Sequence, residues 1–187
     1  MAAKKKRPKQ VAVVHCNGGT RAKKKIEYSC TDCNEAAAVC EGGPLECAEG
    51  CLGCGTCVEA CRLKAIHIND FGVAQVDPEK CVGCGLCIEK CPRGVIGLHR
   101  PDCRIVPLCS NTQKGIDPKT KTGAKTACDV SCIACGLCVK KCPADAIHLE
   151  DFHAVIDENE CLSCGFCAVS CPRGVIADML GILTPAR

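Results

Sequence analysis

The sequence predicts an α+β fold made of two tandem copies of one small module, with little regular secondary structure. One cysteine-rich run occurs four times, and the segments between the runs of each pair match one another. The chain has 187 residues and 24 cysteines, but only three Phe, one Tyr and no Trp. A chain of this length would ordinarily bury one hydrophobic core, so groups bound to the cysteines are needed to supply volume and cross-links.

The repeated run has the spacing C-x2-C-x2-C-x3-C. Its four copies are Cys51, Cys54, Cys57 and Cys61; Cys81, Cys84, Cys87 and Cys91; Cys132, Cys135, Cys138 and Cys142; and Cys161, Cys164, Cys167 and Cys171. A glycine follows the second cysteine of every run, which suits a loop with unusual backbone angles. Pro92, Pro143 and Pro172 follow three of the runs, whereas Arg62 follows the first.

This spacing is typical of bacterial ferredoxins, in which the fourth cysteine of each run ligates the other cluster of a pair. A zinc site would more commonly use two separated CxxC pairs. The sequence therefore predicts four [4Fe–4S] clusters, with one or two more as an alternative. The expected ligand sets are Cys51, Cys54, Cys57 and Cys91; Cys81, Cys84, Cys87 and Cys61; Cys132, Cys135, Cys138 and Cys171; and Cys161, Cys164, Cys167 and Cys142.

The predicted modules span residues 47–101 and 128–178. Residues 1–46 form a basic tail with a cysteine-containing extension, residues 102–127 a linker with a second extension, and residues 179–187 a C-terminal tail. Within each module, a spacer (64–81 and 145–161) is expected to form two short strands around a turn that contains Asn or Asp.

Eight cysteines lie outside the runs: Cys16, Cys30, Cys33, Cys40, Cys47, Cys103, Cys109 and Cys128. The segment VAVVHCNGG resembles RIVPLCSN, so Cys16 corresponds to Cys109, and Cys47 and Cys128 each lie four residues before a run. These cysteines are interpreted as buried free thiols, as ligands of a fifth or sixth cluster, or as a zinc site built from Cys30, Cys33, Cys40 and Cys47. Cys47 and Cys128 are the favoured extra ligands.

The N-terminus is basic, but no apolar signal region follows it, and no stretch approaches 18 uninterrupted apolar residues. We therefore expect no transmembrane segment in these residues and a reducing, cytoplasmic location. A peripheral position at the inner face of the cell membrane, held by partner subunits, is the alternative.

The formal charge of +3 treats the cysteines as neutral, and four bound clusters would bring it to about −5. The basic clusters at Lys4–Arg7, Arg21–Lys25 and Lys114–Lys125 are thus interpreted as solvated surface, or as a docking site for an acidic electron carrier. Nucleic-acid binding is not expected, because no aromatic residues are interleaved. No nucleotide-binding motif or catalytic triad occurs, so no catalytic residue is predicted.

The segments VAVVHCNGG, SCTDCNEAAAVCEGGPLECAEGCLGCGTC, CPRGVI, PLCSN and ACDVSCIACGLC occur in this order. Together they resemble the ferredoxin-type portion of the B-type subunit of the Rnf ion-translocating ferredoxin:NAD oxidoreductase complex, over roughly Val11 to Ile176. Cys54 stands where many relatives have Leu, and these residues contain neither the N-terminal membrane helix nor the additional cluster domain common in the family. Both a shortened chain and a soluble relative that serves a different oxidoreductase agree with this difference.

The resemblance implies an electron-transfer subunit of an oxidoreductase complex. It would relay single electrons between a ferredoxin-type donor and a partner, either a flavoprotein or Rnf-type membrane subunits. The alternative is a free-standing, soluble polyferredoxin that has no permanent partner.

Overall fold

The computed structural model describes residues 9–183, so the basic residues Lys4–Arg7 and the end of the expected C-terminal tail lie outside the described part. Its helices are short: η1 (Gly19–Arg21), α1 (Cys33–Ala38), α2 (Thr56–Ala60), α3 (Leu86–Glu89), α4 (Ala124–Ala127), α5 (Leu137–Lys141) and α6 (Phe166–Ser170). Its strands are β1 (Val11–Val14), β2 (Ile66–Ile68), β3 (Ala74–Val76), β4 (Ile96–His99), β5 (Ile105–Pro107), β6 (Ile147–Glu150), β7 (His153–Ile156) and β8 (Ile176–Asp178). None of the helices in residues 9–183 has the length and apolarity needed to cross a bilayer.

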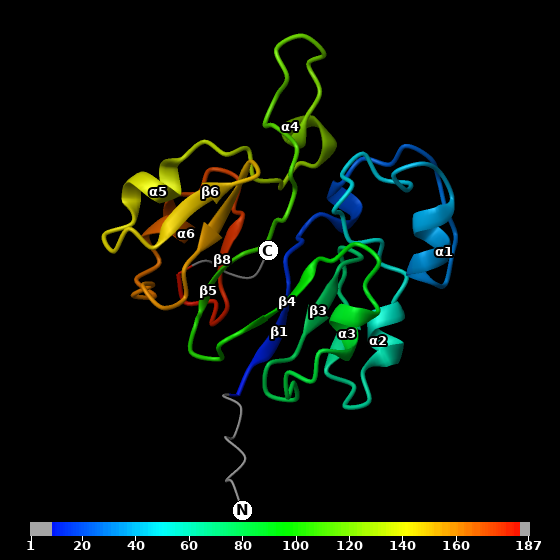
Figure 1. The fold of residues 1–187 in the computed structure, drawn as a ribbon, viewed down its shortest axis with the longest axis horizontal. Helices are drawn as coiled ribbons and strands as arrows, with labels where there is room; N and C mark the ends of the chain where they lie inside the picture. Colours follow the sequence, from blue (N-terminus) through cyan, green and yellow to red (C-terminus); the bar gives the residue numbers. More distant parts are fainter. Residues whose placement is uncertain (1–8, 184–187) are drawn as a thin grey trace, which may run out of the picture.

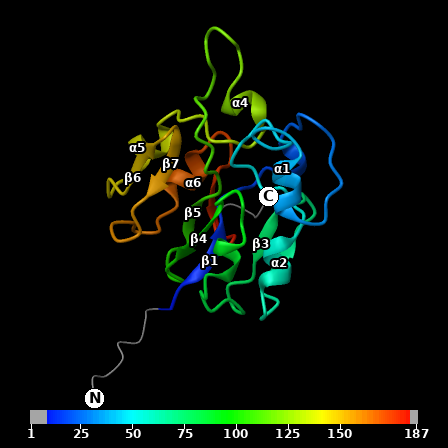
Figure 2. The same ribbon diagram turned by 45° about the vertical axis from the view of Figure 1, so that its right-hand side comes forward.

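The strands form two-stranded antiparallel sheets, and the two modules lie side by side (Figure 1). The first module carries β1 to β4 with α2 and α3, and the second carries β5 to β8 with α5 and α6 (Figure 2). The strand pair expected in each spacer is confirmed: β2 pairs with β3, and β6 pairs with β7. The pairing places Ile66 opposite Val76 in the first module and Ile147 opposite Ile156 in the second.

The remaining sheet of each module uses a strand from upstream of the expected boundaries. Strand β1, within 1–46, pairs with β4, and β5, within 102–127, pairs with β8. All four residues of β1 and all three of β5 are buried. These apolar segments gain their burial by completing a module, so the sheets of the two modules begin well before residues 47 and 128.

The core of each module consists of small residues packed around cysteines. The largest fully buried apolar side chains are Ile and Val, and Phe71, Phe152 and Phe166 are all exposed. The first, third and fourth cysteines of every run pack into the same two clusters of buried residues. Protein atoms alone therefore leave these cores short of large side chains, as the composition predicts.

A glycine with a positive φ angle precedes the helix of every run. Gly55, Gly85, Gly136 and Gly165 have φ angles of 91°, 86°, 73° and 76°, and they cap α2, α3, α5 and α6. Residues with a side chain rarely adopt this left-handed conformation, so the glycine lets the chain turn from the cysteine loop directly into the helix.

The end of the second module depends on a buried ion pair. Arg104 Nε and Nη2 donate to Asp178 Oδ1 and Oδ2 at 3.1 and 2.6 Å, and the Asp178 side chain is fully buried. Asp178 also accepts hydrogen bonds from the backbone N–H groups of Leu180 and Leu183, both at 3.1 Å. The Arg104 guanidinium is the main reason why the pKa of Asp178 is lowered to about 2.

We expect Asp178→Asn to lower the free energy of unfolding at pH 7 by about 2 kcal/mol, because the change removes a charge that the fold stabilises. The folded pKa lies below the unfolded value, so this stabilisation is complete at neutral pH and is lost only as the pH falls from about 4 towards about 2. Anaerobic thermal unfolding of the loaded protein would measure it. Asp102→Asn is the matched control, because the Arg100–Asp102 pair is exposed and should contribute at most about 1 kcal/mol. Equal effects of the two changes would contradict the prediction.

Candidate metal-cluster sites

In the second module, one pocket gathers four cysteines. Cys132, Cys135, Cys138 and Cys171 line it together with apolar residues. Three of these thiols come from one loop and the start of α5, and Cys171 comes from the end of the other run. This is the crossed set expected from the sequence. The backbone N–H of Val175 donates to Cys171 Sγ at 3.3 Å.

The second run of each module places its first three cysteines around one loop and helix. Burial is the main influence that raises the pKa of Cys87, and the neighbouring Cys81 and Cys84 raise it further. Burial likewise raises the pKa of Cys167, and Cys161 and Cys164 add to this effect. Their expected fourth ligands, Cys61 and Cys142, pack against the core of the same module. Backbone N–H groups again point at sulfur: Ala65 donates to Cys61 Sγ and Ala12 to Cys81 Sγ, both at 3.3 Å.

In the equivalent pocket of the first module, Cys33 takes the place expected for Cys54, the second cysteine of the run. The pocket is lined by Cys33, Cys51, Cys57 and Cys91, and Cys54 does not line it. Cys33 also stands among the thiols that raise the pKa of Cys57, with Cys51 and Cys91. The Cys54 thiol is turned to the Leu52 carbonyl oxygen at 3.6 Å. The expected set with Cys54 is therefore not the set that this pocket brings together.

Helix α1 carries Cys33 to this pocket. Asp32 caps the helix by accepting hydrogen bonds from the backbone N–H groups of Asn34 and Glu35. The Cys33 N–H donates to Thr56 Oγ1 at 2.7 Å, and Thr56 Oγ1 donates to Asp32 Oδ2 at 3.0 Å. The start of α1 is thus fastened to the start of α2.

Thr56 is the signal in the sequence that could have revealed this contact. The residue after the capping glycine is Leu86, Leu137 or Phe166 in the other three runs, and it is a short polar residue only in the first. Together with Arg62 in place of proline, Thr56 marks the first run as the one that receives a partner from elsewhere in the chain.

The chemistry of these pockets fits an iron–sulfur core. Burial, their main influence, raises the pKa of Cys51 to about 11 and that of Cys57 and Cys167 to about 12. Neighbouring thiolates raise these pKa values further, so a set of four ionised thiols requires a bound positive group. Ferric and ferrous iron supply that charge, and the donated N–H···S bonds suit sulfur that carries negative charge.

Cys16, Cys47, Cys109 and Cys128 line a further pocket between the two modules. The zinc alternative grouped Cys47 with Cys30, Cys33 and Cys40, but the structure does not bring that set together. The Cys40 thiol instead donates to the Gly43 carbonyl at 3.1 Å. Within residues 9–183, no three His, Cys, Asp or Glu side chains are arranged to hold a single metal ion.

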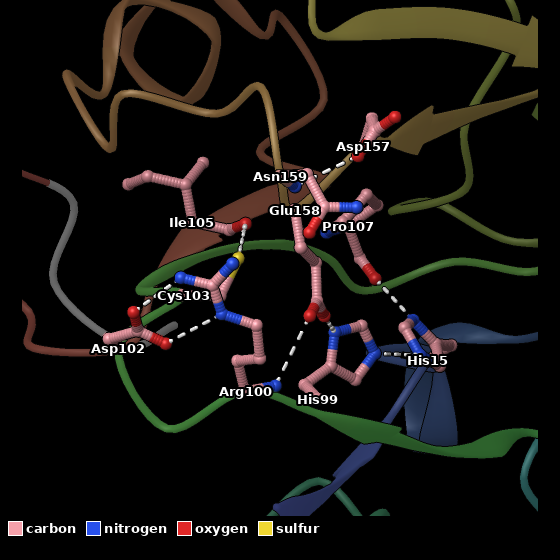
Figure 3. Close-up of polar contacts among 10 residues, drawn as sticks. All are labelled: His15, His99, Arg100, Asp102, Cys103, Ile105, Pro107, Asp157, Glu158 and Asn159. Carbon is pink, nitrogen blue, oxygen red and sulfur yellow. Dashed lines mark hydrogen bonds and ion pairs between the residues drawn. The ribbon is translucent and has the colours of Figure 1, made fainter. Parts of the chain in front are cut away.

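A chain of polar contacts next to this pocket joins the two modules (Figure 3). His15 Nδ1 lies 2.8 Å from the Pro107 carbonyl oxygen, and His99 Nε2 lies 2.8 Å from His15 Nε2. His99 Nδ1 forms an ion pair with Glu158, which also accepts a hydrogen bond from the Arg100 N–H. Burial lowers the pKa of His15, which favours a neutral ring at this position.

Comparison with family models gives two matches, both described as a 4Fe-4S dicluster domain. One matches residues 50–95 and again 131–175, and the other matches residues 73–143. Two dicluster domains correspond to four [4Fe–4S] clusters, so the predicted cofactor is confirmed.

Curated relatives agree with the resemblance seen in the sequence, and three of them are B-type subunits of ion-translocating oxidoreductase complexes. The one from the ion-translocating oxidoreductase complex of Methanosarcina acetivorans is 36% identical over 81% of this chain and 56% of its own length. The one from the proton-translocating ferredoxin:NAD(+) oxidoreductase complex of Clostridium ljungdahlii is 39% identical over 80% and 51%. The one from the Na(+)-translocating ferredoxin:NAD(+) oxidoreductase complex of Acetobacterium woodii is 40% identical over 80% and 43%.

This chain therefore spans about half the length of the curated relatives that it matches. A chain of a formate dehydrogenase–heterodisulfide reductase–formylmethanofuran dehydrogenase complex from Methanospirillum hungatei also matches. It is 21% identical over 68% of this chain and 51% of that chain, with a TM-score of 0.25. The chain belongs to the 4Fe–4S dicluster ferredoxin proteins, and over four-fifths of its length it is a relative of the B-type subunits of ion-translocating ferredoxin:NAD(+) oxidoreductase complexes.

Proposed function

We propose that this chain relays single electrons between a ferredoxin-type donor and a partner oxidoreductase, as a subunit of a complex. The observation that carries the proposal is a pair of four-cysteine pockets at equivalent places in the two modules. Each pocket combines cysteines of the first run of its module with the last cysteine of the second run. The printed names of the relatives, which are subunits of ferredoxin:NAD(+) oxidoreductase complexes, support the same role.

We propose the crossed ligand sets for three of the clusters: Cys81, Cys84, Cys87 and Cys61; Cys132, Cys135, Cys138 and Cys171; and Cys161, Cys164, Cys167 and Cys142. For the first cluster, the lining of its pocket favours Cys33 with Cys51, Cys57 and Cys91 over the set that contains Cys54. The polar tie between Cys33 and Thr56 supports this choice, because it fixes the cysteine at the rim of the pocket.

When bound, each cluster supplies one reversible one-electron step. The thiolates hold the iron, and the N–H groups of Ala12, Ala65 and Val175 stabilise the negative charge on their sulfur partners. Apolar residues such as Val95 and Val175 line the pockets and limit the access of water. The described residues thus set the environment of a one-electron carrier.

Electrons are proposed to enter and leave at the second cysteines of three runs. Cys84, Cys135 and Cys164 are exposed, whereas Cys54 is only partly exposed and packs with the α1 segment. The segment around α1 therefore covers the first cluster site and leaves three cluster edges open to a donor and a partner. The partner is proposed to be a flavoprotein or a membrane subunit of an Rnf-type complex.

Anaerobically purified protein should contain at least about 16 iron and 16 acid-labile sulfide per chain, and reduced ferredoxin should bleach its visible absorbance. Iron and sulfide assays with stopped-flow reduction would check both. Low sulfide, or clusters that no ferredoxin reduces, would contradict the proposed function. Size-exclusion of native extract then separates a complex subunit, which co-migrates with a flavoprotein, from a free polyferredoxin, which elutes alone.

A further inference from the structure

Four cysteines outside the runs meet in one pocket between the modules. Cys16 follows β1 and Cys109 follows β5, and the two residues face each other in an isolated antiparallel bridge. Cys47 and Cys128 complete the lining. These residues come from four separate segments of the chain, so only the tertiary fold brings the four thiols together.

The pocket has the symmetry of the duplicated chain. The Cys51 N–H donates to Cys16 Sγ at 3.4 Å, and the equivalent Cys132 N–H donates to Cys109 Sγ at 3.3 Å. Cys47 and Cys128 are likewise equivalent, since each lies four residues before a run. Each module thus contributes the same pair of thiols, and a compact four-thiolate site between them is compatible with this approximate two-fold relation.

Several hydrogen-bond donors point at the sulfur atoms of this pocket, and one carboxylate oxygen, Glu49 Oε2, lies 3.8 Å from Cys47 Sγ. Asn111 is 1% exposed, and its Nδ2 donates to Cys47 Sγ at 3.1 Å. Its Oδ1 accepts from the Gln113 N–H at 2.7 Å, which orients the amide group. The Gly18 N–H adds a bond of 3.4 Å to Cys16 Sγ. Such donors stabilise sulfur that carries negative charge, as in a thiolate bound to iron.

Gly18 and Arg173 shape the pocket around Cys128. The space beside Cys128 is kept open by Gly18, where an added Cβ would lie 3.2 Å from Cys128 Sγ and 3.7 Å from Cys16 Sγ. The Arg173 guanidinium donates to the Cys128 carbonyl oxygen at 2.6 Å and so holds the Cys128 segment in place.

We propose that Cys16, Cys47, Cys109 and Cys128 ligate a fifth [4Fe–4S] cluster, which joins the two modules into one conducting path. The inference rests on the proposed function. Such a cluster would accept one electron from a reduced cluster of one module and pass one electron to an oxidised cluster of the other, so its oxidation state would be unchanged after each transfer. The first cysteine of the adjacent run on each side donates directly to a ligand sulfur, which gives both modules a short route to the site.

The test counts iron, sulfide and zinc per chain in Cys16→Ala/Cys109→Ala and in Cys47→Ala/Cys128→Ala. Each pair removes two of the four ligands symmetrically. Both variants should contain about four iron and four sulfide fewer than the wild type, which should contain at least about 20 of each. The matched control is Cys40→Ala/Cys103→Ala, whose thiols are directed to the carbonyls of Gly43 and Ile105, and it should equal the wild type.

Iron in the variants equal to that in the wild type would overturn the fifth cluster, and so would the loss of about one zinc without loss of sulfide. If a variant does not fold, the wild-type count decides: about 20 supports the proposal, and about 16 overturns it. The two proposals fail differently. Failure of the fifth cluster alone leaves about 16 reducible iron in every sample, whereas failure of the proposed function leaves the wild type without sulfide or without reduction by ferredoxin.

Discussion

Replacing Cys33 by Ala is expected to remove the first cluster, with about four iron and four sulfide lost per chain, whereas Cys54→Ala should keep them. The pocket formed with Cys51, Cys57 and Cys91 is lined by Cys33 and not by Cys54. The Cys54 thiol instead faces the Leu52 carbonyl, and burial together with Cys33 raises its pKa to about 12.

The measurement is anaerobic iron and sulfide analysis with spin quantitation of the reduced protein. Cys135→Ala is the matched control, because Cys135 occupies the place of Cys54 in the second module and does line its pocket. That variant should lose a cluster. Retention of the full iron content by Cys33→Ala, together with its loss in Cys54→Ala, would restore the simple rule that each run supplies its own three ligands.

Thr56→Leu tests the same assignment without removing a cysteine. The change installs the residue found after the glycine of two other runs and removes the acceptor for the Cys33 N–H. We expect partial loss of iron from the first cluster and no change in the second module. Leu137→Thr is the reciprocal control and should leave the iron content unchanged, because Cys135 stays in its own loop. Full iron in Thr56→Leu would show that α1 holds Cys33 without this contact.

Removing the clusters is expected to abolish cooperative unfolding of the whole chain. The buried apolar residues are mainly Ala, Val, Ile and Cys, and no Phe is buried in residues 9–183. The first, third and fourth cysteines of all four runs pack into the two module cores. Loss of the clusters leaves a void lined by thiols in each core, and the free energy of cluster binding is then lost to folding, as in other small metal-dependent domains.

Treatment with an iron chelator and ferricyanide should therefore eliminate the sigmoidal thermal transition and most amide hydrogen-exchange protection in β1, β4, β5 and β8. Protein incubated anaerobically with the chelator alone is the control, and it should keep its clusters and its transition. Persistent protection in these strands after complete removal of iron would show that the small-residue core is sufficient by itself.

The two predictions address different levels of the structure. Unfolding on cluster removal follows from composition, which the sequence states directly. The choice between Cys33 and Cys54 follows from a contact between residues 23 positions apart, made by the Cys33 N–H and Thr56. Composition and spacing give no distance between α1 and α2, so no count of cysteines could have made that choice.

The sequence by itself determined the duplication, the cluster type, the glycine caps and the strand pairs within the spacers. Each of these depends on residues close together in the chain, where fixed spacing implies a fixed local geometry. Only the tertiary structure decided that β1 and β5 belong to the sheets of the modules, that Cys33 reaches the first pocket and that Cys16, Cys47, Cys109 and Cys128 meet. These contacts join segments distant in sequence, and their geometry is set by the packing of whole modules rather than by any local pattern.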